Sequence, residues 1–361
     1  MLMAGKTKQS KQQFSGLRLS TFAQALRRDW QRLGLAQNGE TVLIAVSGGA
    51  YSVALLLALD ELVKSGKLKL RIAVAHLDHK LRGPASTSDA LWVAKLAKQL
   101  RHQITVGSID VKKRAARGSE NLEQAARRIR YDFLEKTAKK MKAGMVLTAH
   151  TMDDQAETVL LNLLRGSCAD GLGGIEPIRS LVEGKEPLLV RPLVSWARRQ
   201  DTEDYCRKRG VEFRQDEMNL DENFARVRVR RQLLPLMEGF NPKVVQGLTR
   251  TAELLREDTM ALESAAARLL ELAADGEPVS RNRKGTSAAL RLDLLVMADP
   301  ALRRRALRQW ISRCRGNLRR LERVHILAVE NLLFGDRGGR VIELPGGSKV
   351  SRKSGLIRYH G

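Results

Sequence analysis

One short segment places an imidazole and three carboxylates on the same face of a predicted helix. His150, Asp153, Asp154 and Glu157 stand at positions i, i+3, i+4 and i+7, and the helix is expected over 153–165. Such a group can bind a metal ion or a cationic substrate, and the imidazole can move a proton. Acidic residues in a first turn also stabilise a helix through its dipole, but that explanation covers only Asp153 and Asp154. We therefore predict a functional site on this face.

A second segment has the composition of a phosphate-binding loop. It follows an apolar stretch over 41–46 and leads into a predicted helix over 52–64. Its residues are Ser47, Gly48, Gly49, Ala50, Tyr51 and Ser52. Two glycines let a ligand approach the backbone closely, and N–H groups at a helix N-terminus attract anions. An ordinary turn between a strand and a helix has a similar composition. The segment matches neither G-x-x-x-x-G-K-S/T nor G-x-G-x-x-G, which excludes two well-known nucleotide loops.

Both segments belong to a chain in which apolar strands alternate with helices. Strands are expected over 41–46, 70–75, 102–109 and 145–149, with an additional edge strand over 186–193. Helices are expected over 21–33, 52–64, 88–101, 119–142 and 153–165. This alternation predicts an α/β fold with a doubly wound, mostly parallel sheet that is covered on both faces.

The carboxyl ends of the strands in such a sheet line one edge, and ligands bind there. Three polar clusters follow predicted strands: the glycine loop, the segment from His76 to His79, and His150. We therefore expect the loop and the acidic helix face to line one shared pocket. His76 and His79 are expected in its nucleotide-binding part.

The charge of the chain favours an anionic partner. The 361 residues include 64 Lys and Arg against 40 Asp and Glu, which gives a formal net charge of +24, and 43% of them are hydrophobic. Residues 301–361 alone hold 15 basic and four acidic side chains. A globular chain with this concentration of positive charge near one end is typical of proteins that bind nucleic acid.

Several other classes of protein are excluded. The longest unbroken apolar run, Val53–Leu59, is far shorter than the ~20 residues that a membrane span needs. The first residues are polar and basic and lack the apolar core of a secretory signal. Cys168, Cys206 and Cys314 are too scattered for a disulfide framework, a zinc site or iron–sulfur ligands. We expect a cytoplasmic protein that does not associate with a membrane.

Four segments are expected along the chain. Residues 1–19 are predicted to be a mobile basic arm, and residues 20–240 an α/β domain that carries the pocket. Residues 241–287 are predicted to be a helical linker, in which an amphipathic helix precedes a polar stretch. Residues 288–361 are predicted to be a small basic domain that binds the nucleic-acid substrate.

Taken in chain order, the motifs resemble those of tRNA(Ile)-lysidine synthetases, a family of the PP-loop ATP pyrophosphatase superfamily, whose fold is adenine nucleotide alpha hydrolase-like. The glycine loop is similar to the superfamily pattern S-G-G-x-D-S. Further matches are HLDHKLR at 76–82, NLEQAARRIRYDFL at 121–134, HTMDDQAETVLLNLLRGS at 150–167, GLGGI at 171–175, RPL at 191–193, the segment from Asn219 to Arg230, LLP at 233–235 and LPGG at 344–347. The resemblance covers residues 20–361 and rests on the ordered set of motifs.

The resemblance implies a two-step ligation. O2 of the wobble cytidine, at position 34 of the isoleucine tRNA with a CAU anticodon, attacks the α-phosphate of ATP, and pyrophosphate leaves. The ε-amine of L-lysine then attacks C2 of the adenylated base, and AMP leaves. The product, lysidine, switches decoding from AUG to AUA. ATP and Mg²⁺ are the implied cofactors, the tRNA and lysine are the implied partners, and a homodimer is left open.

The resemblance also implies roles for individual residues. The loop residues 47–52 would bind ATP together with His76 and His79. Asp154 and Glu157 would bind the lysine ammonium, Asp153 would contact Mg²⁺ or the adenylate, and His150 would move a proton. Contacts with the tRNA or the adenylate are implied for Arg82, Arg127, Arg128, Arg130, Arg165, Arg191, Arg226 and Arg230.

Three positions differ from the family pattern. Tyr51 stands where the loop has Asp, Cys168 where Gly is usual, and Val227 where Asn is usual. A phenol is a poorer Mg²⁺ ligand than a carboxylate, and losing a metal clamp on pyrophosphate would lower a rate by on the order of 10² to 10³. A catalytically impaired tRNA-binding homologue is therefore an alternative.

Two further alternatives use part of the same motifs. A tRNA thiolase shares the ATP loop, but the paired cysteines of its iron–sulfur type are absent from the sequence. The acidic helix face and LPGG favour lysine ligation over sulfur transfer. A metal-dependent hydrolase would use the acidic face alone and would leave the glycine loop and the basic C-terminal segment without a role.

Overall fold

The computed structural model describes residues 18–80, 84–111, 113–114, 122–182, 184–214, 224–275, 289–334 and 340–361. These residues form two compact units, divided between Glu253 and Leu254. Among the predicted features, Arg82, residues 1–17 of the basic arm, Asn219 and most of the polar stretch before residue 288 lie outside the described residues.

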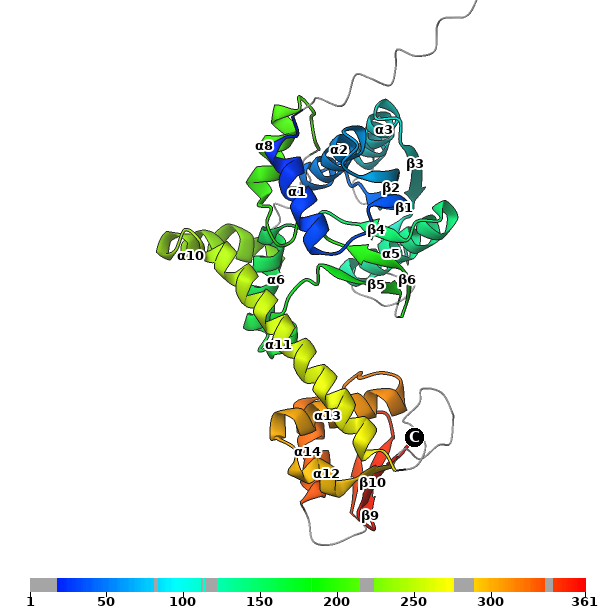
Figure 1. Ribbon diagram of the computed structural model, residues 1–361, viewed down its shortest axis with the longest axis vertical. Helices are drawn as coiled ribbons and strands as arrows, with labels where there is room; N and C mark the ends of the chain where they lie inside the picture. Colours follow the sequence, from blue (N-terminus) through cyan, green and yellow to red (C-terminus); the bar gives the residue numbers. More distant parts are fainter. Residues whose placement is uncertain are drawn as a thin grey trace, which may run out of the picture. The chain divides into compact units, whose positions relative to one another are not determined.

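A six-stranded sheet is the centre of the first unit (Figure 1). Its strands are β1 (Asn38–Ala45), β2 (Lys69–Asp78), β3 (Gln103–Ser108), β4 (Met145–Leu147), β5 (Ile178–Val182) and β6 (Lys185–Val190). They lie in the order β3-β2-β1-β4-β6-β5, and only β5 is antiparallel to its neighbour. The predicted doubly wound, mostly parallel sheet is therefore confirmed.

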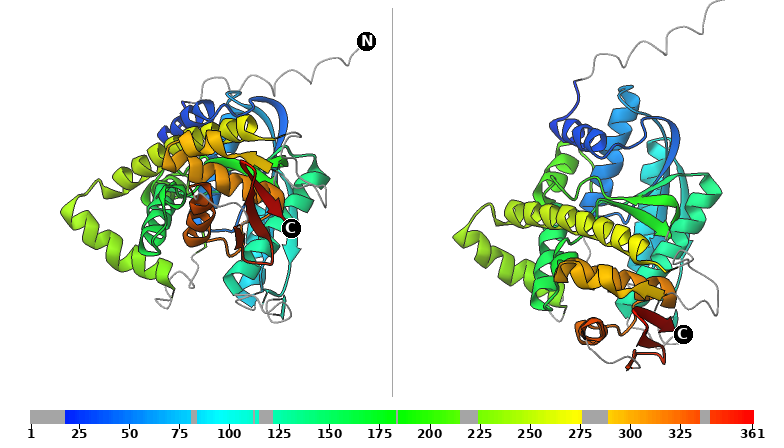
Figure 2. Two further views of the ribbon diagram at one scale, coloured as in Figure 1. Left: turned by 90° about the horizontal axis from the view of Figure 1, so that it is seen from below. Right: turned by 60° about the horizontal axis from the view of Figure 1, so that its bottom comes forward.

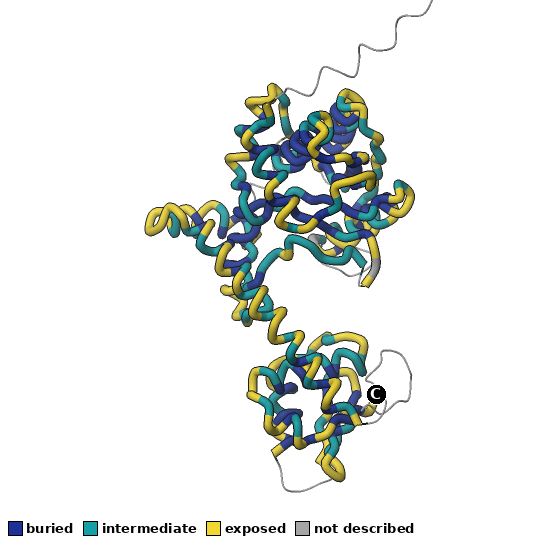
Figure 3. Tube along the Cα trace, in the orientation of Figure 1, coloured by how far each residue is buried: buried dark blue, intermediate teal, exposed yellow. Residues whose placement is uncertain are grey.

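Helices cover both faces of this sheet (Figures 1 and 2). Val42 and Ile44 face one core, which four helices complete, whereas Leu43 and Val146 face the opposite core, which one long helix completes. The four helices are α1 (Thr21–Arg32), α2 (Ala50–Lys64), α3 (Pro84–Gln99) and α8 (Arg199–Lys208), and the long helix is α5 (Leu122–Met141). Because the strands are covered on both sides, most of their length is buried (Figure 3).

The prediction of an edge strand over 186–193 is wrong. β6 pairs with β4 on one side and with β5 on the other, so it is an internal strand. The physical reason lies in its composition, since Leu189 and Val190 are fully buried, as expected for a strand with neighbours on both sides. The edge is β5, whose residues are all half-buried and whose short polar-interrupted pattern gave no strand prediction.

Shorter helices pack at the carboxyl edge of the sheet. α6 (Met152–Leu164) follows β4 and is succeeded by α7 (Ala169–Leu172). Later in the chain come α9 (Ala225–Arg228), a π-helical turn η2 (Val229–Leu233), α10 (Leu234–Phe240) and the long α11 (Val244–Ala273). Met152, Ala156 and Leu160 of α6 share an apolar cluster with Val229 and Leu234. This cluster fixes α6 against the segment that carries Arg226 and Arg230.

The second unit has its own core around an antiparallel sheet. The order is β7-β10-β9-β8, from β7 (Ala289–Arg291), β8 (Val341–Glu343), β9 (Lys349–Lys353) and β10 (Leu356–His360). α12 (Leu292–Met297), α13 (Pro300–Arg315) and α14 (Arg323–Leu333) pack with it. Ala266, Leu270 and Ala273 of α11 also belong to this core. The end of the predicted linker helix is thus part of the second unit. No helix in the described part of the chain is long and apolar enough to cross a membrane.

We predict opposite stability effects for two glycine substitutions. A Cβ at Gly107 of β3 would lie 2.6 and 2.9 Å from ring carbons of Phe133 on α5, so Gly107→Ala should lower the free energy of unfolding by about 1–3 kcal/mol. Gly247, inside α11, has nothing within 4 Å of such a Cβ, so Gly247→Ala should raise it by up to about 1 kcal/mol. Urea or thermal unfolding of both variants would measure this, and destabilisation by Gly247→Ala would contradict the packing described.

Candidate active site

The glycine loop is held in shape by its own two serines. Ser52 Oγ accepts the Ser47 N–H at 3.1 Å and donates to the Gly49 carbonyl at 3.0 Å, while α2 begins at Ala50. Gly48 has φ +98°, a left-handed conformation that side chains disfavour. The loop therefore forms the tight strand-to-helix turn that the sequence predicts, at the carboxyl end of β1.

A later segment packs over one side of this turn. The Arg214 N–H donates to the Gly48 carbonyl at 2.9 Å, and the Arg214 side chain lies 3.6 Å from the position of a Gly48 Cβ. Its guanidinium also lies 5.6 Å from the centre of the Trp92 ring and 3.5 Å from Asp89. Gly48 is buried by these contacts, whereas Ser47 stays exposed and Gly49 half-buried. The turn is thus covered on one side and accessible at Ser47.

The two aspartates at the start of α6 make structural contacts. Asp154 Oδ2 accepts the backbone N–H and the hydroxyl of Thr151 at 2.9 and 3.1 Å, which caps α6. Asp153 Oδ2 accepts the backbone N–H of Arg199 at 2.7 Å, and its Oδ1 accepts the Arg198 guanidinium at 3.0 Å. Asp153 therefore fixes the start of α8 beside the start of α6.

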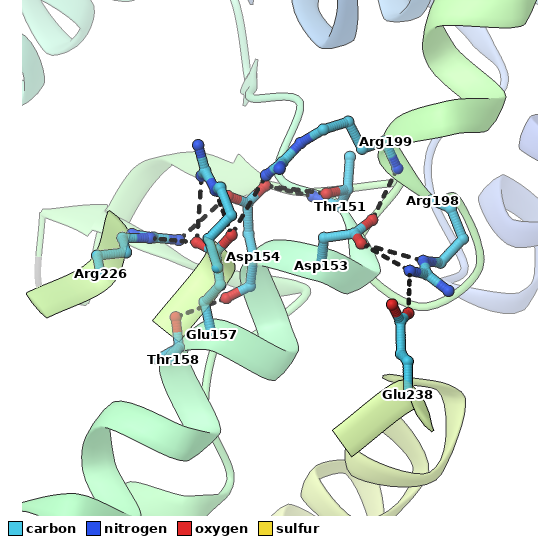
Figure 4. A network of polar contacts seen from close by, with 10 residues as sticks. Thr151, Asp153, Asp154, Glu157, Thr158, Arg198, Arg199, Arg226 and Glu238 are labelled. Carbon is cyan, nitrogen blue, oxygen red and sulfur yellow. Dashed lines mark hydrogen bonds and ion pairs between the residues drawn. The ribbon is translucent and has the colours of Figure 1, made fainter. Parts of the chain in front are cut away.

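Glu157 is the centre of the polar network in Figure 4. Its side chain is fully buried, and three guanidinium groups compensate its charge. Arg226 and Arg230 donate through their Nε atoms at 2.7 Å each, and Arg199 donates at 3.2 Å. A fully buried carboxylate requires such partners, because its desolvation is costly. Sequence spacing indicated Glu157, but the arginines that hold it come from α8, α9 and η2.

The acidic face is consequently not an open cation site. Four carboxylates are matched by four guanidinium groups in the printed contacts: Asp153, Asp154, Glu157 and Glu238 pair with Arg198, Arg199, Arg226 and Arg230. Burial alone would lower the pKa of Arg226, but Asp154 and Glu157 outweigh it and raise that pKa. Any cationic substrate must therefore share or replace one of these arginine contacts.

A cavity of about 180 Å³ lies beside this network within the first unit. Charged side chains of both signs line it, together with an apolar wall. The lining residues are Asp153, Glu157, Arg198, Arg199, Arg230, Leu234, Pro235, Glu238 and Val245. Its volume suits a small molecule rather than a nucleotide.

His76 and His79, at the end of β2, also reach the carboxyl edge. His76 Nδ1 lies 2.8 Å from the Val46 carbonyl, directly before the loop. Burial, reinforced by Arg130, lowers the pKa of His79 to about 4. His150, on the Thr148 hydroxyl at 3.1 Å, has its pKa lowered to about 4 by burial, with Asp154 opposing and Arg191 adding to the shift. Both imidazoles are therefore neutral at pH 7.

Several of the predicted arginines gather around Tyr131 of α5. The guanidinium of Arg127 lies 5.5 Å from the centre of the ring and that of Arg179 lies 5.2 Å from it. Arg191 is buried and interacts with the same phenol, and burial is the main cause of its lowered pKa. Sequence analysis did not indicate Arg179 or Tyr131, because neither stands in a recognisable spacing. The group forms a positive surface beside His150 and Arg130.

Two other predicted arginines do not join this group. Arg128 points along α5 to Asp132, with a distance of 3.9 Å. Arg165 is exposed at the C-terminal end of α6, about 18 Å along the helix axis from Asp153.

Tyr51 joins the glycine loop to the acidic helix. The guanidinium of Arg199 lies 5.4 Å from the centre of the Tyr51 ring and donates to Glu157 on α6. The loop and the acidic face therefore share one edge, as the sequence predicts, and a single side chain spans them. Nothing in the sequence distinguished Arg199 from the other basic residues, which number 64 with lysine included.

The residues described around this bridge do not fit a magnesium ion. Mg²⁺ requires oxygen ligands, mainly carboxylates, in octahedral geometry. Tyr51 offers a phenol, both oxygens of Asp153 already accept N–H groups, and the Arg199 guanidinium stands between loop and helix. In the described part of the chain, no group of three or more His, Cys, Asp or Glu residues is arranged to hold a metal. The contacts of Asp153 indicate a capping role rather than the predicted metal contact.

Comparison with known proteins identifies two family domains. Residues 20–237 match the model of the PP-loop domain, and residues 290–361 match the TilS substrate binding domain. A "tRNA(Ile)-lysidine synthase" of Geobacter sulfurreducens is 37% identical over 90% of this chain and 66% of its own length. Another, of Symbiobacterium thermophilum, is 39% identical over 91% of this chain and 67% of its own. The chain spans about two thirds of the length of these relatives.

A solved structure shares the fold of the first unit. The U34-tRNA thiolase NcsA of Methanococcus maripaludis aligns with a TM-score of 0.54 and 16% identity, over 65% of this chain and 79% of that chain. At this identity the likeness shows the fold alone.

Removing the charge of Glu157 should be strongly destabilising. Glu157→Gln leaves three buried guanidinium groups without their shared anion, so we expect the free energy of unfolding to fall by about 3–5 kcal/mol. Glu238→Gln is the matched control, because Glu238 is 36% exposed and pairs only with Arg198 in the printed contacts, so its loss should be below about 1 kcal/mol. Chemical unfolding measures both, and equal losses would contradict the central role of Glu157.

The low pKa of His150 predicts a pH-dependent stability. In the unfolded chain this imidazole takes up a proton near its ordinary pKa of 6.5, but in the folded chain only near 4. The unfolded state therefore binds more protons between these values, so stability falls as the pH is lowered from 6.5 to 4. His150→Gln should show a smaller fall than the unchanged protein. Thermal unfolding across this pH range tests it, and an identical slope in the variant would refute the assignment.

Proposed function

The chain belongs to the tRNA(Ile)-lysidine synthase family of PP-loop proteins, and we propose that it uses ATP to join L-lysine to C2 of the wobble cytidine in the CAU-anticodon isoleucine tRNA. One observation carries the proposal beyond the family match. The glycine loop and the acidic helix face meet through Arg199, which contacts both Tyr51 and Glu157. A nucleotide bound at the loop would therefore stand next to the residues proposed to receive lysine.

The proposed chemistry has two steps that share this edge. Cytidine O2 attacks the α-phosphate of ATP and pyrophosphate leaves, with its charge received by the N–H groups of the loop and by nearby arginines. The lysine ε-amine then attacks C2, and AMP leaves with the bonding electrons of the C2–O2 bond. The amine must lose a proton before or during this step. His150 is neutral at pH 7 and is the proposed acceptor of that proton.

Lysine binding is proposed at the accessible end of the charge network. Asp154 Oδ1 contacts Arg226 at 3.1 Å, and the Arg226 side chain is 39% exposed. A lysine ammonium at Asp154 and Glu157 would take over these contacts from Arg226, which would then be free to bind an anionic group of the adenylate. The exchange keeps the buried charges balanced, as a low-dielectric site requires.

Two positive surfaces support the proposed tRNA partner. Arg127, Arg130, Arg179 and Arg191 gather at the edge of the sheet where the reacting base would enter. Residues 290–361 match the substrate-binding domain of the family, and residues 301–361 carry an excess of 11 positive charges over negative ones, from 15 basic and four acidic residues. Phosphate neutralisation by such surfaces gives an affinity that falls steeply with salt.

The thiolase alternative receives no support from the cysteines. Burial raises the pKa of Cys206 and of Cys314 to about 12, and Cys206 donates to the Ala50 carbonyl. A thiol with such a pKa is a weak nucleophile at neutral pH. A catalytically impaired tRNA-binding homologue stays a candidate, because Tyr51 replaces the loop carboxylate.

Transfer of labelled lysine to tRNA tests the proposal. We expect the full chain, given ATP, Mg²⁺, radiolabelled lysine and a CAU-anticodon isoleucine tRNA, to incorporate lysine into the tRNA and to release AMP in equal amount. A methionine tRNA with the same anticodon is the control. Incorporation only after Tyr51→Asp would establish the impaired homologue. No incorporation by either form would reject lysine ligation.

A further inference from the structure

Arg199 carries more positive charge than its surroundings neutralise. Glu157 receives three guanidinium groups, and the contact of Arg199, at 3.2 Å, is longer than the 2.7 Å Nε contacts of Arg226 and Arg230. Burial, together with repulsion from Arg230 and Arg226, lowers the pKa of Arg199 to about 10. The last arginine added to a carboxylate that is already paired twice is held weakly, and its charge is available to another anion.

The position of Arg199 points to the glycine loop as the place of that anion. Its guanidinium stands 5.4 Å from the centre of the Tyr51 ring, in cation–π range. Its Nε is buried and has no hydrogen-bond partner within the described ranges. A buried donor without a partner is costly, so such an atom beside an anion-binding loop indicates a missing acceptor.

The loop in this chain lacks the carboxylate that would bring a metal to the same place. Tyr51 cannot replace that ligand, and Asp153 is fully used by α8. An aspartate at position 51 would instead form an ion pair with Arg199 and neutralise it. Tyrosine holds the guanidinium over its ring and leaves the positive charge uncompensated.

We propose that Arg199 binds the triphosphate of ATP directly, so that its guanidinium supplies at Tyr51 the positive charge that a loop-bound metal ion would otherwise supply. The inference rests on the ATP site of the proposed function. The planar fork of arginine donates to two phosphate oxygens at once. When Arg199 turns toward the phosphates, Glu157 keeps Arg226 and Arg230, so no buried carboxylate is left alone.

Equilibrium binding of ATP, measured by calorimetry on the full chain with either excess EDTA or Mg²⁺, separates this arrangement from a metal-dependent one. For the unchanged protein we expect affinities within about threefold of each other under the two conditions. Arg199→Gln should weaken ATP binding by about 10- to 100-fold under both, the usual effect of losing charge-assisted hydrogen bonds. Arg199→Lys keeps the charge without the fork and should lose less than Arg199→Gln.

Two further variants sharpen the test. Arg207→Gln removes the same charge from the same helix, where Arg207 pairs with Glu203 and Asp204 at the surface, and should leave ATP affinity unchanged. Tyr51→Asp should bind ATP at least tenfold more tightly with Mg²⁺ than with EDTA. Thermal unfolding of each variant confirms that the fold persists, as expected for Arg199→Gln because two arginines still hold Glu157.

Unchanged ATP affinity in a folded Arg199→Gln variant would overturn the inference, as would a strong requirement for Mg²⁺ in the unchanged protein. The lysine-transfer assay is independent of this result. Lysine incorporation together with Arg199-independent ATP binding would reject only the role of Arg199. Arg199-dependent ATP binding without lysine incorporation would reject only the proposed ligation.

Discussion

The buried charge of Glu157 is the constraint on which the carboxyl edge of the sheet depends. A carboxylate with no solvent contact must be compensated, and the chain does so with Arg199, Arg226 and Arg230. These arginines follow Glu157 by 42, 69 and 73 positions, so one side chain draws α8, α9 and η2 onto α6. The geometry of the edge is set by electrostatics as much as by the apolar cluster beneath it.

The sequence predicted the elements of this edge but not the contacts between them. His150, Asp153, Asp154 and Glu157 form one stripe because helical periodicity is a local property, and the glycine turn is equally local. Their partners could not be predicted, because an ion pair over some 40 residues leaves no periodic signal in a chain with 64 basic residues. The acidic face therefore suggested a cation site, whereas the structure has arginines already placed on it.

Boundaries were predicted less well than elements, also for physical reasons. The interior position of β6 depends on β5, whose half-buried residues show no strong apolar alternation. The linker helix looked independent because amphipathicity does not reveal which core an apolar stripe joins. Ala266, Leu270 and Ala273 in fact complete the core of the second unit. In both cases the missing information was tertiary.

The π-helical turn at Val229–Leu233 lies between two requirements, since Arg230 must reach Glu157 and Leu234 must reach the cluster with Met152. A π turn accommodates one residue more than the same rise of α-helix. Shortening this segment by one residue would restore a regular helix and turn everything after it by about 100°. Leu234 would then swing away from its apolar neighbours while Arg230 stayed in place. Side chains here can be exchanged one for another, but the spacing between the cation and the leucine cannot be shortened.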